Sequence, residues 1–281
     1  MPIARNLGRL LSLVLLTPLL SAGGCIFVHV ERHPSATHTR SHSMTFEDFS
    51  NQPLNVKTEN GSIDVTQWDG DDVQIEAVIR SATQERAGIT HPLAHRDEKG
   101  LHIGVEWAEG ERYEAEGCSF LVKVPSASML DLNSSNGSIT ARGLACPVTA
   151  DTSNANVIIS DAVGAVDVDT SDGSITLHNV SGPVEADTSN AQVSVTLADG
   201  CTHPIFVHTS NGAIHLSVPD DYVGLVSAST SNGSVLASTH ASSMTSHGSK
   251  NNQVIRLGGA GDSAQHSKIS TSNASIIVMA R

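Results

Sequence analysis

One short phrase, Thr-Ser-Asn-Gly-Ser-Ile, recurs along this chain and constrains its fold more than any other feature. Close matches centre on Asn211 and Asn232, and variants centre on Asn60, Asn136, Asn154, Asp172, Asn190 and Asn273. From Asn136 onward the centres are 18, 18, 18, 21, 21 and 41 residues apart, and we interpret the last step as about two periods. Such a short fixed period indicates units that bury their apolar surface only against neighbouring units.

Each unit has the pattern of two short β-strands. Two and four positions before the centre lie Thr and a small or apolar residue, as in Thr152 and Ala150, and apolar residues such as Val157 and Ile159 lie three and five positions after it. A period of two is typical of half-buried strands. The parity changes at the centre, where Asn or Gly can supply the positive φ of a turn. We therefore predict that structural turn and ladder positions are Asn136, Asn154, Asp172, Asn190, Asn211, Asn232 and Asn273.

Two all-β arrangements fit this pattern. The first is a single elongated β-solenoid (β-helix-like) with coils of 18–21 residues and a less regular N-terminal β section. The second is an antiparallel meander of hairpins, because Asn-Gly between alternating strands is also a hairpin signal. The near-constant step favours the solenoid.

The first 50 residues resemble an export signal followed by a tether. Arg5 and Arg9 precede an apolar run over 10–20 and then Ser-Ala-Gly-Gly-Cys, which resembles the lipobox of bacterial lipoproteins with Ala22 in place of the usual Leu. This resemblance implies that 1–24 is a lipoprotein-type signal peptide and that Cys25 is lipidated; the alternative is an ordinary secretory signal. Residues 25–50 carry many Ser and Thr and four histidines, and we predict a flexible linker there.

The remaining chain is predicted to form one continuous domain in two sections. Residues 51–135 form an N-terminal capping β section, and 136–281 form the regular repeats. The predicted location is the cell envelope, either periplasmic or at the outer surface, with a lipid anchor in the membrane. Without 1–24 the chain has 14 basic and 29 acidic residues, so nucleic acid is excluded as a partner. The spacing of Cys146 and Cys201 in the repeats predicts free thiols.

Acidic residues recur three and five positions before the turn centres. In stacked coils they would form two outward columns about 5 Å apart along the stack, which repel one another unless a cation or a basic partner lies between them. Dense oxygen ligands suit Ca²⁺, and the alternative is a solvated charged face. The candidate Ca²⁺ ligands are Asp131, Asp151, Asp167, Asp169, Glu185 and Asp187.

Motifs for catalysis are absent from the sequence. It contains no Gly-x-Ser-x-Gly, no His-Glu-x-x-His and no phosphate-binding loop. We therefore expect no enzyme activity and no cofactor other than Ca²⁺. The alternative function is a carbohydrate-active β-helix enzyme, a lyase or hydrolase, that uses the surface carboxylates.

The Val124-Pro125 opening, the repeated Thr-Ser-Asn-Gly-Ser-Ile phrase and the lipobox-like signal together resemble a bacterial family of β-strand-repeat proteins. Its members are catalogued as putative adhesins of unknown function. The resemblance implies a lipid-anchored envelope protein with a role in adhesion, scaffolding or binding, and it transfers no catalytic residue. The implied partners are the membrane and an envelope or surface polymer or protein.

Overall fold

The computed structural model describes residues 35–239, 244–261 and 263–281. The chain divides into a unit of residues 1–32 and a unit of residues 33–281, and every described residue belongs to the second unit. The predicted signal peptide, Cys25 and the first part of the predicted linker lie outside the described residues. The described chain is all-β apart from one short α-helix and one 3₁₀ turn, as the sequence predicts.

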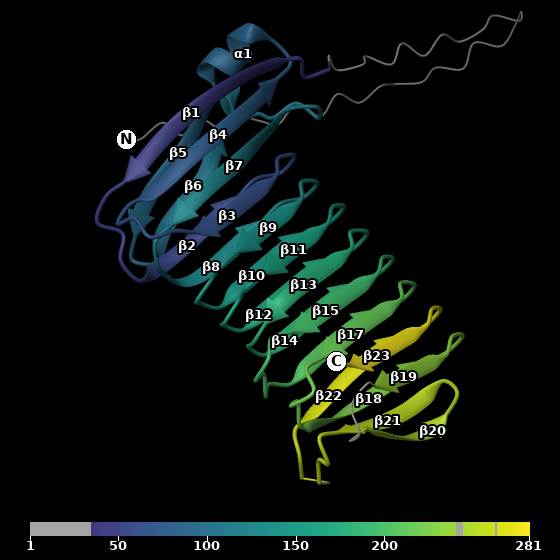
Figure 1. Cartoon of the computed structure of the whole chain (residues 1–281). Coiled ribbons are helices and arrows are strands. Elements are labelled where there is room, and N and C mark those ends of the chain that lie inside the picture. The colour runs from purple at the N-terminus through teal and green to yellow at the C-terminus, as the bar shows by residue number, and fades with distance from the viewer. Residues whose placement is uncertain (1–34, 240–243, 262) are drawn as a thin grey trace, which may run out of the picture. The chain divides into compact units, whose positions relative to one another are not determined.

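The strands form two large mixed sheets (Figure 1). In spatial order, the first sheet contains β1 (His38–Phe46), β4 (Val73–Ser81), β7 (Gly117–Val124), β3 (Ile63–Gln67), β9 (Ile139–Arg142), β11 (Val157–Ser160), β13 (Ile175–Val180), β15 (Val193–Leu197), β17 (Ile214–Val218), β23 (Ile276–Ala280) and β19 (Val235–Thr239). The second sheet contains β20 (Thr245–Ser249), β21 (Asn252–Leu257), β18 (Gly224–Thr230), β22 (His266–Thr271), β16 (Ile205–Thr209), β14 (Val184–Thr188), β12 (Val166–Thr170), β10 (Val148–Thr152), β8 (Ala127–Asn133), β2 (Gln52–Lys57), β6 (Gly100–Glu106) and β5 (His91–Asp97).

Each repeat contributes one strand to each sheet, and equivalent strands of successive repeats pair in parallel. Val148 pairs with Val166, which pairs with Val184, so the register repeats with the sequence period. The first sheet follows the same rule, with Val157 beside Ile175. The alternative prediction of an antiparallel meander is therefore wrong for the repeats, because the two strands that flank each Asn-Gly belong to different sheets.

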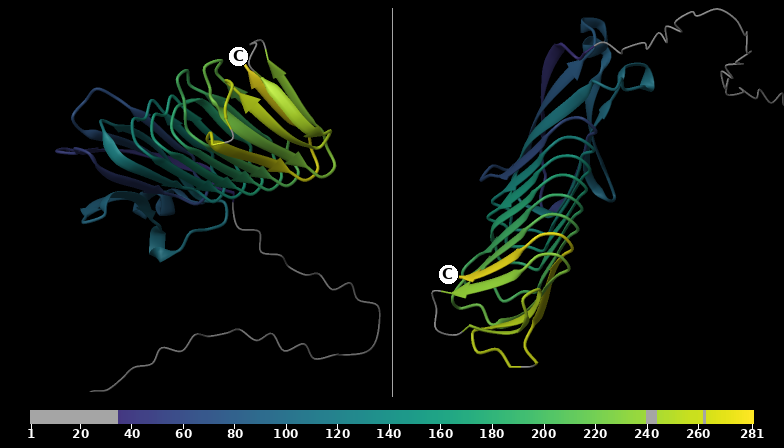
Figure 2. Two further views of the ribbon diagram at one scale, coloured as in Figure 1. Left: turned by 90° about the horizontal axis from the view of Figure 1, so that it is seen from below. Right: turned by 90° about the vertical axis from the view of Figure 1, so that its right-hand side faces the viewer.

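The two sheets bury one continuous apolar core between them (Figure 2). Its side chains come from alternate positions of each strand, as in β12, where Val166 and Val168 are buried and Asp167 and Asp169 are exposed. Burial of each such side chain stabilises the fold by about 1.5–3 kcal/mol before the entropy of ordering is counted. Because this alternation persists along the stack, all outward positions of one sheet lie on one surface.

The turns at the repeat centres depend on a buried threonine (Ser134 in the Asn136 turn) and, in several of them, on a glycine. The Thr209 hydroxyl donates to the carbonyl of Ala191 in the neighbouring repeat at 3.2 Å and accepts from the Gly212 N–H at 3.1 Å. A Cβ on Gly212 would lie 1.6 Å from that same carbonyl oxygen, so only glycine fits there. Threonine thus satisfies its own turn and holds the neighbouring repeat.

The central asparagines form a side-chain ladder on the surface. Asn154 Nδ2 donates to Asn136 Oδ1 at 2.5 Å, and Asn136 donates to Asn60 at 2.6 Å. Asn190 donates to Asp172, Asn211 to Asn190, Asn273 to Asn211 and Asn232 to Asn273, at 2.6–2.8 Å. The Asp172 carboxylate cannot donate to Asn154, so the ladder consists of two runs, from Asn60 to Asn154 and from Asp172 to Asn232, and each run links its turns at a constant spacing.

The N-terminal section extends the parallel stack and then continues as antiparallel strand pairs. β2 and β3 lie directly beside β8 and β9 in parallel, although about 70 residues separate them in the chain. Beyond them, β4 pairs antiparallel with β7, and β5 pairs antiparallel with β6. β7 and β6 still pair in parallel with β3 and β2, and the antiparallel pairing of β4 and β5 on their other sides ends the parallel stack.

The prediction of a flexible linker over 25–50 is wrong for its second half. Residues 38–46 form β1, which pairs antiparallel with β4 along nine residues. Met44 and Phe46 pack against the core from this strand, whereas the alternate positions, such as Thr45, are exposed. The abundance of Ser, Thr and His in β1 conceals its alternation, because only two of its inward side chains are strongly apolar.

A buried carboxylate, Glu116, holds the helix α1 (Gln84–Ile89) to this section. The 3₁₀ turn η1 (Ala108–Gly110) lies near the helix. Arg86 donates to both oxygens of Glu116 at 2.8–2.9 Å, and Ser81 donates to it at 2.5 Å. Burial opposes the charge of Glu116, but hydrogen bonds from Arg86, Ser81, Tyr113 and Ala82 outweigh it and lower the pKa to about 2. No helix in the described part of the chain is long and apolar enough to cross a membrane.

The C-terminal repeat lies out of chain order. β22 pairs in parallel with β16 on one side and β18 on the other, and β23 lies in the same way between β17 and β19. The long last step in the sequence is therefore not two stacked periods. It contains the hairpin β20–β21, which pairs antiparallel with β18 and covers that edge of the second sheet.

We expect Gly173→Ala to destabilise the fold by about 3 kcal/mol, because the added Cβ would lie 1.7 Å from the Ala155 carbonyl oxygen of the neighbouring repeat. Chemical denaturation of the whole chain measures this change. Gly88→Ala in α1 is the matched control, since nothing lies within 4 Å of its Cβ position, and it should stabilise by about 0.5–1 kcal/mol. Equal stability of the Gly173 variant and wild type would contradict the close contact between repeats.

We also expect Glu116→Gln to destabilise the fold at pH 7 by about 3 kcal/mol, the free-energy equivalent of a pKa lowered from 4.5 to about 2. A lowered pKa gives stability that is present above 4.5 and is lost as the pH falls towards 2, so the difference between variant and wild type should narrow over that range. Unfolding curves at several pH values measure it. Glu114→Gln, whose side chain is exposed, should match wild type throughout.

Candidate functional site

Two rows of outward-facing side chains run across the second sheet, each made of directly opposed strand positions. The aspartate row is Lys57, Asn133, Asp151, Asp169, Asp187, His208 and Ser270. The mixed row is His95, His102, Asn55, Asp131, Thr149, Asp167, Glu185, Phe206 and Lys268. The structure places three of the six candidate Ca²⁺ ligands in each row. Adjacent members of a row are about 4.8 Å apart, the spacing of paired strands.

A groove follows the aspartate row across the second sheet, near the C-terminal ends of its strands. It has a volume of about 480 Å³ and is lined by Asp151, Asp169 and Asp187, together with the serines of the neighbouring turns. Lys57 lines one end and His208 lies toward the other. The same Asp-Thr-Ser sequence occurs in three successive repeats, and this is why the groove has a repeating lining rather than a single centre.

The carboxylates of the aspartate row raise the pKa of their neighbours. Burial and the charges of Asp169, Asp131 and Asp167 raise the pKa of Asp151. Burial, Asp187 and Asp167 do the same for the pKa of Asp169. No ion pair of these carboxylates is found among the described residues. The row is therefore a line of uncompensated negative charge, and it attracts cations.

The candidate Ca²⁺ ligands do not converge on one point. Within residues 35–239, 244–261 and 263–281, none of the six belongs to a set of three side chains with ligand atoms inside 4.8 Å of one another. Asp131 instead accepts a hydrogen bond from Asn133 Nδ2 at 2.5 Å. The geometry suits several weak, equivalent cation contacts along the rows.

One stretch of the aspartate row has the residue types of a nucleophilic triad. Asp187, His208 and Ser270 are adjacent, and His208 Nδ1 lies 3.0 Å from Ser270 Oγ. Two parts of such a site are missing among the described residues: no hydrogen bond joins Asp187 to His208, and β22 pairs on both sides, so its backbone N–H groups are not available to stabilise an oxyanion. This stretch is an ordinary part of the row.

The described cysteines offer no reactive thiol. Cys118, Cys146 and Cys201 are free and buried, which confirms the prediction of unpaired thiols. Burial raises the pKa of Cys118 to about 12 and that of Cys146 to about 11, so neither ionises near neutral pH.

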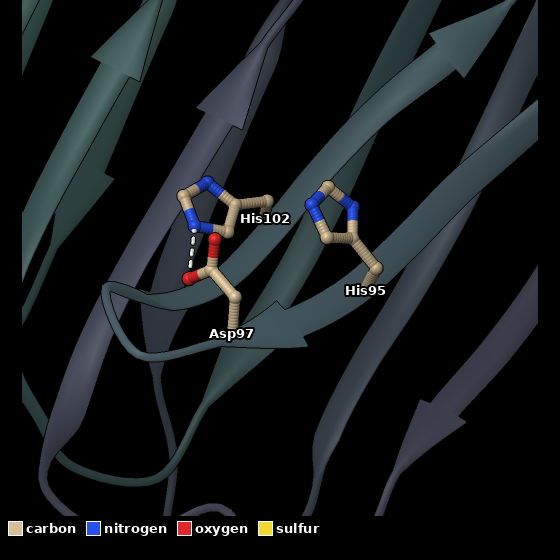
Figure 3. A group of neighbouring side chains, drawn as sticks. All are labelled: His95, Asp97 and His102. Carbon is tan, nitrogen blue, oxygen red and sulfur yellow. Dashed lines mark hydrogen bonds and ion pairs between the residues drawn. The ribbon is translucent and has the colours of Figure 1, made fainter.

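A cluster that the sequence reasoning missed lies at the start of the mixed row (Figure 3). His95, Asp97 and His102 come from the hairpin β5–β6, and their ligand atoms lie within 4.8 Å of one another. The signal was present in the sequence: His95 and Asp97 are two apart, which places them on one face of a strand, and Gly100 marks a turn before His102.

Known proteins match this chain only distantly. A putative cell adhesion protein from Clostridium sporogenes is 9% identical, with coverage of 87% of this chain and 100% of that chain and a TM-score of 0.39. Putative adhesins from Bacteroides fragilis and Parabacteroides distasonis are 10% and 12% identical, cover 86% and 88% of this chain and 97% and 100% of their own, and give TM-scores of 0.32 and 0.33. No curated protein matches the chain.

A family match covers most of the stacked repeats. Residues 122–274, more than half of the chain, match the model of a domain of unknown function, DUF7330. They begin in β7, include every repeat from β8 to β19 and end just before β23. The chain therefore belongs to the DUF7330 family.

Proposed function

We propose that this chain is an exported, lipid-anchored envelope protein whose repeats form a β-solenoid that binds a cationic partner on its acidic face. The role is adhesion or scaffolding without catalysis. The observation that carries the proposal is the aspartate row, in which like charges are held in register with no ion pair found among the described residues. Without a partner, such an arrangement costs stability.

The solenoid is supported by the parallel pairing of the repeats. The repeats from β8 to β19 each give one strand to each sheet at a step of 18–21 residues, the C-terminal repeat adds β22 and β23, and the Asn ladder follows the turns. A partner therefore meets a carboxylate at three successive steps of the aspartate row, at Asp151, Asp169 and Asp187. Several individually weak contacts of this kind add up to firm binding when the partner has charges at a similar spacing.

The partner we infer is an envelope or surface polymer or protein with a basic segment that binds the carboxylates directly. Where the partner instead presents anionic oxygen groups, Ca²⁺ would join them to the carboxylates. Oxygen-rich rows suit this hard cation. A carbohydrate-active enzyme is not favoured, because the residues that line the groove repeat and do not single out an acid and a base. The groove lining also includes no Trp, Tyr or Phe on which a sugar ring could stack.

We expect Asp151→Asn with Asp169→Asn to raise the stability at pH 7 by at most about 1 kcal/mol. A raised pKa means that the ionised form costs stability at neutral pH, and that this cost disappears as the carboxyl is protonated. The gain should therefore shrink as the pH falls towards 4, and it should also shrink in high salt. Thermal unfolding across pH measures both trends. Asp71→Asn with Asp220→Asn, an equal charge change at two exposed positions outside the rows, is the control.

The same double variant tests the binding function. Calorimetric titration with Ca²⁺, and separately with an oligolysine peptide, should give weaker binding than wild type for at least one of these probes. A variant that is more stable yet binds less well identifies residues kept for function. The acidic face would be rejected as a binding surface if neither probe bound wild type, or if the control variant Asp71→Asn, Asp220→Asn weakened binding as much.

We expect Cys25→Ser to abolish incorporation of labelled fatty acid and to move the protein from the membrane fraction to the soluble fraction, because the serine hydroxyl cannot form the thioether to the lipid. Acyl anchoring contributes about 0.8 kcal/mol per buried methylene, so its loss should be plain in a fractionation experiment. Cys201→Ala, which removes a buried thiol in the repeats, is the control. Unchanged labelling of Cys25→Ser would contradict the anchor.

A further inference from the structure

The hairpin β5–β6 carries three potential metal ligands on one face (Figure 3). His95 and His102 are directly opposed across the two strands, and their rings stack with centroids 5.0 Å apart and planes 18° from parallel. Asp97 lies two residues beyond His95, and its Oδ1 is 2.9 Å from His102 Nε2. Two imidazoles and one carboxylate thus meet above a pair of strands.

The ligands stand on a supported piece of backbone. His102 pairs with Asn55 in the second sheet, and Leu101 and Ile103 on either side of it are buried in the core. The backbone N–H of Lys99 donates to Asp97 Oδ1 at 2.7 Å, which orients the carboxylate toward the histidines. Little backbone rearrangement is therefore needed for all three groups to contact one ion.

The donor set selects a class of metal. Neutral imidazole suits Zn²⁺, Cu²⁺ and Ni²⁺, whereas Ca²⁺ prefers oxygen ligands alone. Three protein ligands leave at least one position open, as in zinc sites that bind a further group. The cluster therefore differs in kind from the acidic rows, although the two histidines belong to the mixed row.

The two histidines also line a hollow that contains a further carboxylate, Asp131. This hollow has a volume of about 640 Å³ and is lined by His95 and His102, and also by Asp131, Glu59 and Lys57. Glu59 is ion-paired with Arg112 at 2.5 Å, so Asp131, which is next to Asn55 in the same row, is the carboxylate of the hollow that can attract a cation. A bound ion would thus be open to a further ligand from the hollow or from a partner.

We propose that His95, Asp97 and His102 form a binding site for a divalent transition-metal ion such as Zn²⁺. The ion takes the place of the direct contact between His102 and Asp97 and joins both side chains to His95. The site lies on the surface, so binding is reversible and open to exchange.

The test is calorimetric titration of Zn²⁺ into the purified whole chain, followed by titration of Co²⁺, whose visible absorption reports nitrogen ligands. Wild type should bind one more equivalent than the triple variant His95→Gln, Asp97→Asn, His102→Gln, and this subtraction removes weak binding by other histidines. Either single histidine variant should lower the affinity of that equivalent by at least about tenfold. Zn²⁺ should also raise the melting temperature of wild type but not that of the triple variant.

His178→Gln is the matched control, because His178 is an exposed histidine on β13 in the other sheet. It should bind Zn²⁺ as wild type does. All variants are compared by circular dichroism and by melting without metal, and because the three side chains are on the surface they should fold normally. The proposal is overturned if wild type and the triple variant bind equal amounts of Zn²⁺, or if His178→Gln lowers the affinity as much as His95→Gln.

Discussion

The contact between neighbouring turns sets the register of the whole stack. The Thr209 hydroxyl is fully buried, so it must both donate and accept a hydrogen bond, and it finds its acceptor only in the neighbouring repeat. Gly212 lets that repeat approach, because a side chain there would collide with the same carbonyl. A slip of one residue would break these bonds and turn the core side chains outward. The alignment of the outward rows is a consequence of this constraint.

Much of the fold was predictable from the sequence. The period of two within each repeat indicates which residues face inward, and the period of 18 residues indicates which repeats are neighbours. The buried Thr positions and the outward Asp positions follow from these periods directly. The strand β1 did not follow, since Met44 and Phe46 are its only strongly apolar inward residues. The buried pair of Arg86 and Glu116 was not predictable either, because the two residues are 30 positions apart in the chain and no sequence pattern indicates their contact.

The position of the last repeat could not be read from its spacing, since the length of a connection does not determine which strand its end will join. A second pattern in the turns does carry the information. From Asn136 onward, the residue after the turn centre alternates between Gly and Ala only when the C-terminal repeat is placed between the two before it; before Asn136, Gly61 lies beside Gly137 and does not alternate. In spatial order these residues are Gly137, Ala155, Gly173, Ala191, Gly212, Ala274 and Gly233. Chain order places the two glycines Gly212 and Gly233 together.

The histidine cluster shows why spacing must be judged against the correct element. On a helix, histidines four apart share a face, and by that test Pro92 excludes His91 and His95 as a pair. On a hairpin the relation is symmetric about the turn, and His95 meets His102 across it. The strand β6, which carries His102, pairs with β2, and β2 pairs with β8. The two histidines and the carboxylates of the mixed row therefore follow one another at the same strand spacing. A partner that bridges them must therefore match the strand spacing of about 4.8 Å.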